Sequence, residues 1–304
     1  MHKMEKTLRE NIRAGRGQGH GAGYQPWLQI ARRKMPSNSN INLRNLPQLG
    51  RHGHFLSRNE VNIGIWLLWL GADDLREQFP LWPFEHPHPL YGHPAMTEHR
   101  LPWSRGTLTI ARELGIDHGW CMGKSIPYVA TTDFLLTVFM DGTPRVVAVA
   151  AKPAAIVEGH IKATQRVKER LALELAYARE LGIPWHLLSD ECIPLPLREN
   201  LELNLTAAVL PETLACPARI EDYCGGLADD LRAGNPLGES RDRANQRQHL
   251  NEIDGRALFN HGLWTRRLPV DLRLPLAMSQ PATLTDFAWA ETAATTLLHG
   301  GHHG

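Results

Sequence analysis

The chain has 304 residues, 42% of them apolar and 21% charged, which is the composition of a globular protein with material for one or two domains. The net charge of +1 excludes a molecule coated in basic surface, and no apolar run approaches the ~20 residues of a transmembrane helix. The charged N-terminal segment lacks the apolar stretch of a secretory signal, and the four cysteines form no CxxC pair. We therefore expect a cytoplasmic protein with reduced thiols.

Residues 1–50 are expected to form a basic N-terminal arm. Residues 1–60 contain eleven Lys and Arg against three Glu, a local excess of eight positive charges on a nearly neutral chain. Such an arm is typical of a protein that binds a polyanion such as DNA, although a solvated arm without a ligand would have the same composition. The candidate DNA-binding residues are Arg13, Arg16, Arg32 and Arg33.

A glycine-rich segment, GRGQGHG, occupies residues 15–21 of this arm. It matches neither the GxGxxG pattern nor the P-loop pattern with its GK[ST] ending, and no strand is predicted before it. A loop that approaches DNA phosphate and a plain flexible segment both remain open.

Residues 57–70 (SRNEVNIGIWLLWL) predict a helix that is buried on most sides, because it is almost wholly apolar after its first turn. It begins with a capping box, in which Ser57 is the N-cap and Glu60 the third helical residue. Residues 80–105 contain too many prolines for a helix or a central strand and predict a long loop. Its histidines stand among prolines without cysteine, which favours a variable loop over a zinc site.

Residues 131–152 (TTDFLLTVFMDGTPRVVAVAAK) predict a β-hairpin, because two β-branched and apolar runs flank the turn sequence DGTP. Residues 160–181 place apolar side chains at helical spacing, and residues 183–189 predict a short buried strand. The order helix, hairpin, helix, strand indicates an α/β domain with a mixed sheet and flanking helices, at residues 51–192.

Residues 193–304 are expected to form a mainly α winged-helix domain that binds a partner or DNA. Helical segments extend to about residue 232, and another helix is predicted within residues 244–262. Residues 264–278 (WTRRLPVDLRLPLAM) then suggest two short strands. A helix pair followed by a hairpin is the pattern of a winged helix.

Hydrolysis of a phosphodiester needs an activated water and a counter-ion for the developing charge, which carboxylates holding Mg²⁺ and a lysine can supply. If the hairpin turn is centred between residues 142 and 143, Asp133 and Lys152 lie directly opposite each other, and Ala150 shares their face. Alone, this pair could be a plain salt bridge at a sheet edge. Glu60 likewise has an adequate role as a helix cap.

Seven short strings add a resemblance, because they occur in a characteristic order and spacing. They are RAGRGQGHG (13–21), YQPWL (24–28), LSRNE (56–60), REQFPL (76–81), TTDFL (131–135), AKPAA (151–155) and GIPW (182–185). Together they resemble the TnsA family, the endonuclease subunit of heteromeric cut-and-paste DNA transposases, over roughly residues 10–192. Residues 193–304 resemble the family more weakly, chiefly through HLNEIDGRALFNHGLW.

The resemblance implies a restriction-endonuclease-like catalytic domain followed by a winged-helix domain. Glu60 falls on the family's N-terminal metal-binding glutamate, Asp133 on its central aspartate and Lys152 on its catalytic lysine. The Ala151 carbonyl would join the two carboxylates at a Mg²⁺ ion, for which Mn²⁺ could substitute. Ala150 departs from the pattern, because such nucleases usually carry Glu, Asp or Gln two residues before the lysine. Glu174 is a candidate for the missing carboxylate, with a surface or capping role as the alternative.

By resemblance, the chain would hydrolyse the phosphodiester at the 5′ ends of a transposon, on the non-transferred strands. The implied partners are transposon-end DNA, a DDE-type transposase subunit and an AAA+ ATPase regulator, in a bacterial cytoplasm at the nucleoid. Two alternatives stay open. One is a stand-alone restriction-like nuclease with the same three residues, and the other is an adaptor that has lost catalysis, for which Ala150 is the best argument.

Overall fold

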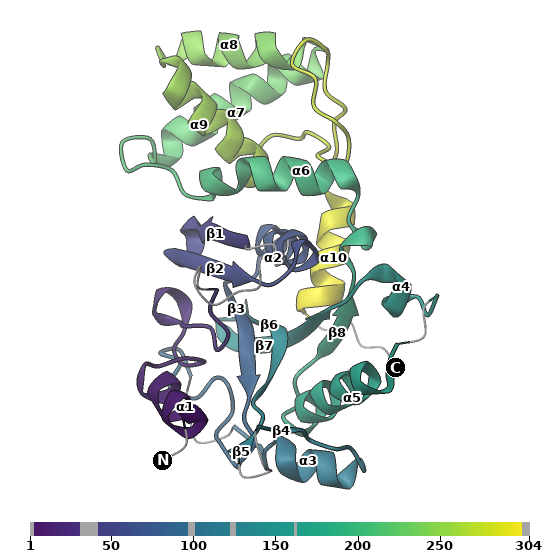
Figure 1. Ribbon diagram of the computed structural model, residues 1–304. Coiled ribbons are helices and arrows are strands. Elements are labelled where there is room, and N and C mark those ends of the chain that lie inside the picture. The colour runs from purple at the N-terminus through teal and green to yellow at the C-terminus, as the bar shows by residue number, and fades with distance from the viewer. Residues whose placement is uncertain (1–2, 31–41, 97–100, 122–125, 161–162, 300–304) are drawn as a thin grey trace.

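The computed structural model describes residues 3–30, 42–96, 101–121, 126–160 and 163–299 (Figure 1). A four-stranded sheet in the order β3-β6-β7-β8 lies at its centre. β6 pairs antiparallel with both β3 and β7, and β8 is parallel to β7, so the predicted mixed sheet is confirmed. The strands are β3 (Asp74–Leu81), β6 (Ala130–Met140), β7 (Thr143–Ala151) and β8 (Trp185–Leu188).

Helices cover both faces of this sheet. Phe134 of β6 lies in the same apolar core as the buried helix α2 (Arg58–Leu70), and the next residue, Leu135, lies in a second core with Tyr177 of α5 (Gln165–Glu180). Successive residues of a strand point to opposite faces, so α2 and α5 cover opposite sides of β6. The apolar run predicted α2 and the helical spacing of apolar residues predicted α5, and both helices are confirmed.

The hairpin is present, but its turn lies one residue earlier than predicted. Met140 pairs with Thr143, so Asp141 and Gly142 form a two-residue turn. Both have positive φ, 50° and 74°, and an Asp-Gly pair adopts this left-handed geometry readily.

This register corrects the predicted position of Lys152. The ladder pairs Phe134 with Val149, and its continuation places Asp133 opposite Ala150. Lys152 lies just beyond the end of β7, diagonal to Asp133, so the prediction that the two lie directly opposite each other is wrong.

The N-terminal arm is more structured than predicted. It begins with the helix α1 (Lys3–Arg13), and β1 (Asn42–Leu46) pairs with β2 (Arg51–Phe55) in a small sheet of their own. Arg32 and Arg33, two of the predicted DNA-binding residues, lie outside the described residues. The remaining short elements before the C-terminal region are α3 (Thr107–Glu113), β4 (Trp120–Cys121), β5 (Ile126–Pro127) and α4 (Ala154–Val157).

The C-terminal region is helical, and Figure 1 shows α6 to α9 as a group at the top of the view, with α10 running back beside α2. Trp289 of α10 stacks on Trp69 of α2, with ring centroids 5.5 Å apart. One continuous apolar core joins α2 to these helices, while the boundary at residue 193 stays a prediction. The helices are α6 (Leu195–Asn204), α7 (Pro217–Arg232), α8 (Leu237–Arg247), α9 (Glu252–Trp264) and α10 (Ala288–Leu298).

The segment between α9 and α10 contains the predicted wing. Instead of paired strands it forms two isolated bridges, Val270 with Leu284 and Pro281 with Pro236. Prolines in this segment remove main-chain donors, which disfavours a regular ladder. The helical character is as predicted, and the winged-helix assignment is not confirmed. Within the described residues, no helix is long and apolar enough to cross a membrane.

Candidate active site

Asp133 and Lys152 meet where β6 and β7 lie side by side. Lys152 Nζ donates to Asp133 Oδ2 at 2.7 Å and to the Ala151 carbonyl at 2.9 Å. The Ala151 main-chain N–H also donates to Asp133 Oδ2, at 2.7 Å. The side chains of Lys152 and Asp133 are 24% and 15% exposed. The diagonal register therefore brings the pair together, and solvent can reach it.

Glu60 forms the predicted capping box at the start of α2. Its main-chain N–H donates to Ser57 Oγ at 3.2 Å, while Ser57 Oγ and the Leu56 N–H donate to its two carboxylate oxygens, each at 2.9 Å. Burial, and then the charge of Asp133, raise the pKa of Glu60 to about 7. Glu60 is therefore a cap whose charge is unfavourable where it stands, and a cation beside Asp133 would relieve that cost.

Gln78 also belongs to this cluster, and we did not predict it. Its amide Nε2 donates to Glu60 Oε2 at 3.0 Å, and Thr131 Oγ1 donates to its Oε1 at 3.2 Å. Glu77 pairs with Phe134 and Phe79 pairs with Thr132, so Gln78 lies across from Asp133. Its φ of 50° lies in the left-handed region, which is strained for a non-glycine residue within a strand.

This left-handed residue inverts the side-chain alternation of β3. Leu75 lies in the core with α2, whereas Phe79 lies in the core with α5, although residues four apart in a regular strand share a face. Glu77 forms a two-pronged ion pair with Arg51 of β2, while Gln78 contacts Glu60 at the start of α2 and Thr131 of β6. The polar run Arg-Glu-Gln within this fully buried strand marks these residues as unusual, although nothing in it specifies a left-handed backbone at Gln78.

Glu174 on α5 is buried rather than at the surface, with 4% of the residue exposed, so its alternative role as a surface residue is wrong. Burial, and then the charge of Asp133, raise its pKa to about 8. Its Oε2 atom has no hydrogen-bond partner within the described parts of the chain. A buried carboxyl group is costly to ionise, and the nearby charge of Asp133 makes Glu174 a candidate for the missing carboxylate.

We expect Glu174→Gln to stabilise the protein at alkaline pH. In the unfolded chain the carboxyl ionises near its ordinary value of 4.5, and in the folded chain only near 8. The folded state thus binds more protons between these values, and stability falls as the pH rises through this window. Urea unfolding should show Glu174→Gln more stable than the native chain by roughly 5 kcal/mol at pH 9, with little difference at pH 4. An equal difference at both pH values would contradict a buried, protonated Glu174.

The donors at this site suit a hard cation held partly by water. Among the described residues, no three His, Cys, Asp or Glu side chains form a metal-binding group. The carboxylates of Glu60 and Asp133 and the Ala151 carbonyl are nevertheless the oxygen ligands that Mg²⁺ prefers, and Mg²⁺ usually keeps several waters. Both hydrogen bonds to Asp133 use Oδ2, so Oδ1 is the atom that we expect to face an ion. Ala150, fully buried, offers no side-chain ligand.

The two described arginines of the predicted DNA-binding set lie on the arm. Arg13 is exposed at the last turn of α1, and Arg16 follows it in the glycine-rich segment. Burial is the main cause that lowers the pKa of His54 on β2, and Arg16 is near enough to contribute.

Comparison with known proteins defines the class of this fold and site. A family model described as TnsA-like endonuclease N terminal matches residues 76–190, a range that contains Asp133 and Lys152 and ends before α6. The mixed sheet between helices fits this endonuclease-like class. The chain is also 32% identical over 199 residues to the transposon Tn7 transposition protein TnsA of Escherichia coli. This match covers 65% of this chain and 62% of the length of that protein. Over these residues the chain is similar to the TnsA family of endonucleases.

Proposed function

We propose that this chain is the metal-dependent DNA endonuclease subunit of a transposase, and that it hydrolyses the phosphodiester at the 5′, non-transferred ends of a transposon. The observation that carries the proposal is that Lys152 contacts Asp133 at the end of the β6–β7 hairpin, while Gln78, across from Asp133, holds Glu60 at the start of α2. A carboxylate pair beside a lysine is the donor set that metal-assisted phosphodiester hydrolysis needs.

In this proposal Glu60, Asp133 and the Ala151 carbonyl would hold Mg²⁺, with Mn²⁺ as a substitute. When bound, the ion supplies a nucleophilic water at neutral pH and neutralises charge on the phosphate. Lys152 would present its ammonium group to the scissile phosphate, where it favours the negative charge that develops during hydrolysis. Gln78 acts as a positioning residue, because its amide holds one carboxylate oxygen of Glu60.

The proposed partners follow from the similarity to the TnsA family. Transposon-end DNA would be the substrate, a DDE-type transposase subunit would cut and join the 3′ ends, and an AAA+ ATPase regulator would dock on residues 193–304. Arg13 and Arg16 support a DNA partner, since they are basic groups on the arm near the sheet. A cytoplasmic location is part of the same proposal.

A catalytically impaired adaptor is the second candidate. Ala150 lies across from Asp133 and is fully buried, so it removes the side-chain ligand that nucleases of this architecture usually carry there. A stand-alone restriction-like nuclease is the third candidate. It would cut DNA without a partner transposase.

Removal of the metal separates these candidates. With the partner transposase and transposon-end DNA, we expect 5′ cleavage in Mg²⁺, complete loss of cleavage in EDTA, and recovery in Mn²⁺. Denaturing gels with each strand labelled separately measure the 5′ and 3′ products. An adaptor would leave every 5′ end uncut while the partner still cut the 3′ ends. A stand-alone nuclease would give the same 5′ products alone.

A further inference from the structure

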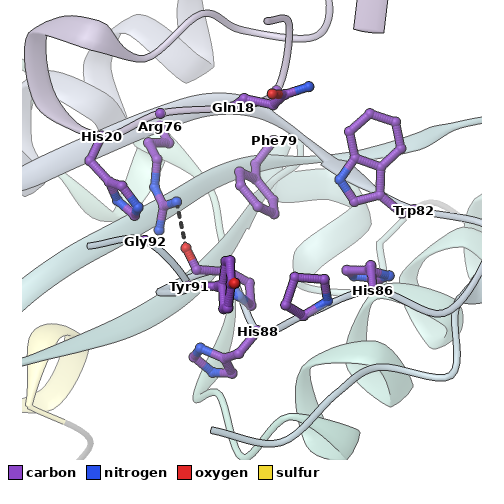
Figure 2. A pocket seen from close by; sticks show the side chains of 13 residues that line it. Gln18, His20, Arg76, Phe79, Trp82, His86, His88, Tyr91 and Gly92 are labelled. Carbon is purple, nitrogen blue, oxygen red and sulfur yellow. Dashed lines mark hydrogen bonds between the residues drawn. The ribbon is translucent and has the colours of Figure 1, made fainter. Parts of the chain in front are cut away.

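A cavity of about 410 Å³ opens beside β3, and Gln78 does not line it. Arg76 and Phe79 of β3 line one wall, and Figure 2 shows Tyr91, His88 and Trp82 around the same space. The glycine-rich segment of the N-terminal arm closes another side. The inverted alternation of β3 creates this wall, because it turns Phe79 to the side of Arg76.

Arg76 is buried in this cavity, and its guanidinium group has N–H donors available for a ligand. It is 1% exposed, and its Nη1 donates to the Pro89 carbonyl at 2.9 Å, the bond drawn in Figure 2. Its Nε and Nη2 have no hydrogen-bond partner in the ranges that the structure describes. The Asp74 carboxylate is 4.0 Å from Nε, and Asp74 also accepts a bond from the Gly21 N–H. Unmade hydrogen bonds of a buried guanidinium are costly, so these donors are suited to an incoming oxygen acceptor.

The other polar groups of the cavity are neutral near pH 7. Burial, followed by the charge of Arg76, lowers the pKa of both His20 and His88 to about 4. Arg76 is therefore the cationic donor of the cavity, and the histidines can only donate or accept uncharged hydrogen bonds.

Flat apolar surfaces complete the lining. Phe79, Trp82 and Tyr91 all contribute, and Tyr91 is 53% exposed at the rim. A cavity of this volume accepts a small organic ligand. Aromatic rings stack on nucleic-acid bases, and an arginine fork binds phosphate oxygens. A ligand with one phosphate and one flat ring satisfies both features.

We propose that this cavity binds one unpaired nucleotide of the DNA, with its phosphate on Arg76 and its base against Trp82 and Tyr91. The proposal rests on the proposed function for the presence of DNA and adds a site separate from the hydrolytic centre. The two sites share one strand. Gln78 contacts Glu60, while Arg76 and Phe79, within two residues of it, line the cavity.

DNA binding without cleavage tests this site. The probes are fluorescently labelled duplexes of one arbitrary sequence, either blunt, or with one unpaired terminal nucleotide, or with that nucleotide abasic. Fluorescence anisotropy in EDTA measures Kd for the full chain. We expect the unpaired nucleotide to tighten binding about tenfold relative to the blunt duplex. The abasic nucleotide should give an intermediate Kd, since it keeps the phosphate alone.

Variants assign the two parts of this preference. In Tyr91→Ala, the Kd for the duplex with a normal unpaired nucleotide should equal the Kd for the abasic duplex. In Arg76→Leu, the Kd for the abasic duplex should equal the Kd for the blunt duplex. Trp103→Ala is the matched control, because Trp103 is 57% exposed and does not line the cavity. Tyr91 is at the rim, so its substitution remains informative even if Arg76→Leu does not fold.

The result that overturns the proposal is equal affinity of the native chain for the blunt and unpaired probes, or an unchanged preference in Tyr91→Ala. Failure of the proposed function has a different signature. If the preference is present in the native chain and in Asp133→Asn, but the native chain never cleaves 5′ ends, the nucleotide site stands and the endonuclease proposal falls.

Discussion

Asp133→Asn and Lys152→Ala will each lower the rate of 5′ cleavage by about 10²–10³-fold or more, and neither will affect 3′ strand joining by the partner transposase. Asn keeps the size of Asp133 but removes the charge that would hold a cation. Lys152→Ala removes the ammonium group that lies 2.7 Å from Asp133. Single-turnover cleavage on denaturing gels, with both strands labelled, measures the two reactions together.

Matched substitutions control for unspecific effects. Asp141→Asn makes the same change at the turn of the same hairpin, and Lys168→Ala removes an exposed lysine of α5. Both should cleave like the native chain. Thermal melts must accompany these assays, because loss of Asp133 leaves the Ala151 N–H and Lys152 without their acceptor. If either variant is folded and still cleaves the 5′ ends at the rate of the native chain, the assignment of Asp133 and Lys152 to the active site is refuted.

The elements that the sequence predicts well are those with a clear apolar pattern. The hairpin and the helix before Gly182 follow from the spacing of apolar residues, and the helix at residues 57–70 follows from a nearly continuous apolar run. The hairpin register was off by one turn residue, yet Asp133 and Lys152 still meet. A turn that moves by one residue changes the partner by two, and side chains two apart share a face.

Other features depend on contacts that no local pattern encodes. Residues 1–50 are rich in Gly, Arg, Asn and Pro and show no sustained period, which predicts an arm, although Glu5 with Arg9 and Lys6 with Glu10 are spaced to support the helix α1. The left-handed Gln78 has no sequence signal, because glycine is the residue expected there. Its conformation, and with it the cavity on Arg76, is set by tertiary packing.

The position of Glu60 also shows why a motif alone leaves two roles open. A capping box explains its place in the sequence, and the structure confirms the box. The nearby charge of Asp133 becomes visible only once β6 is packed beside α2. One carboxylate thus has a structural and a proposed chemical role, and an experiment can separate them.

Glu60→Gln is that experiment, because Gln keeps the capping geometry and removes the charge. We expect 5′ cleavage to fall about 10²-fold. The metal-free protein should at the same time become more stable above pH 7. In the native chain the Glu60 carboxyl ionises near 7 when folded and near 4.5 when unfolded, so stability declines between these values, and Gln abolishes that decline. Ser57→Ala is the converse variant, which should lose ~1 kcal/mol of stability and keep cleavage. Full cleavage by Glu60→Gln would reduce Glu60 to a helix cap.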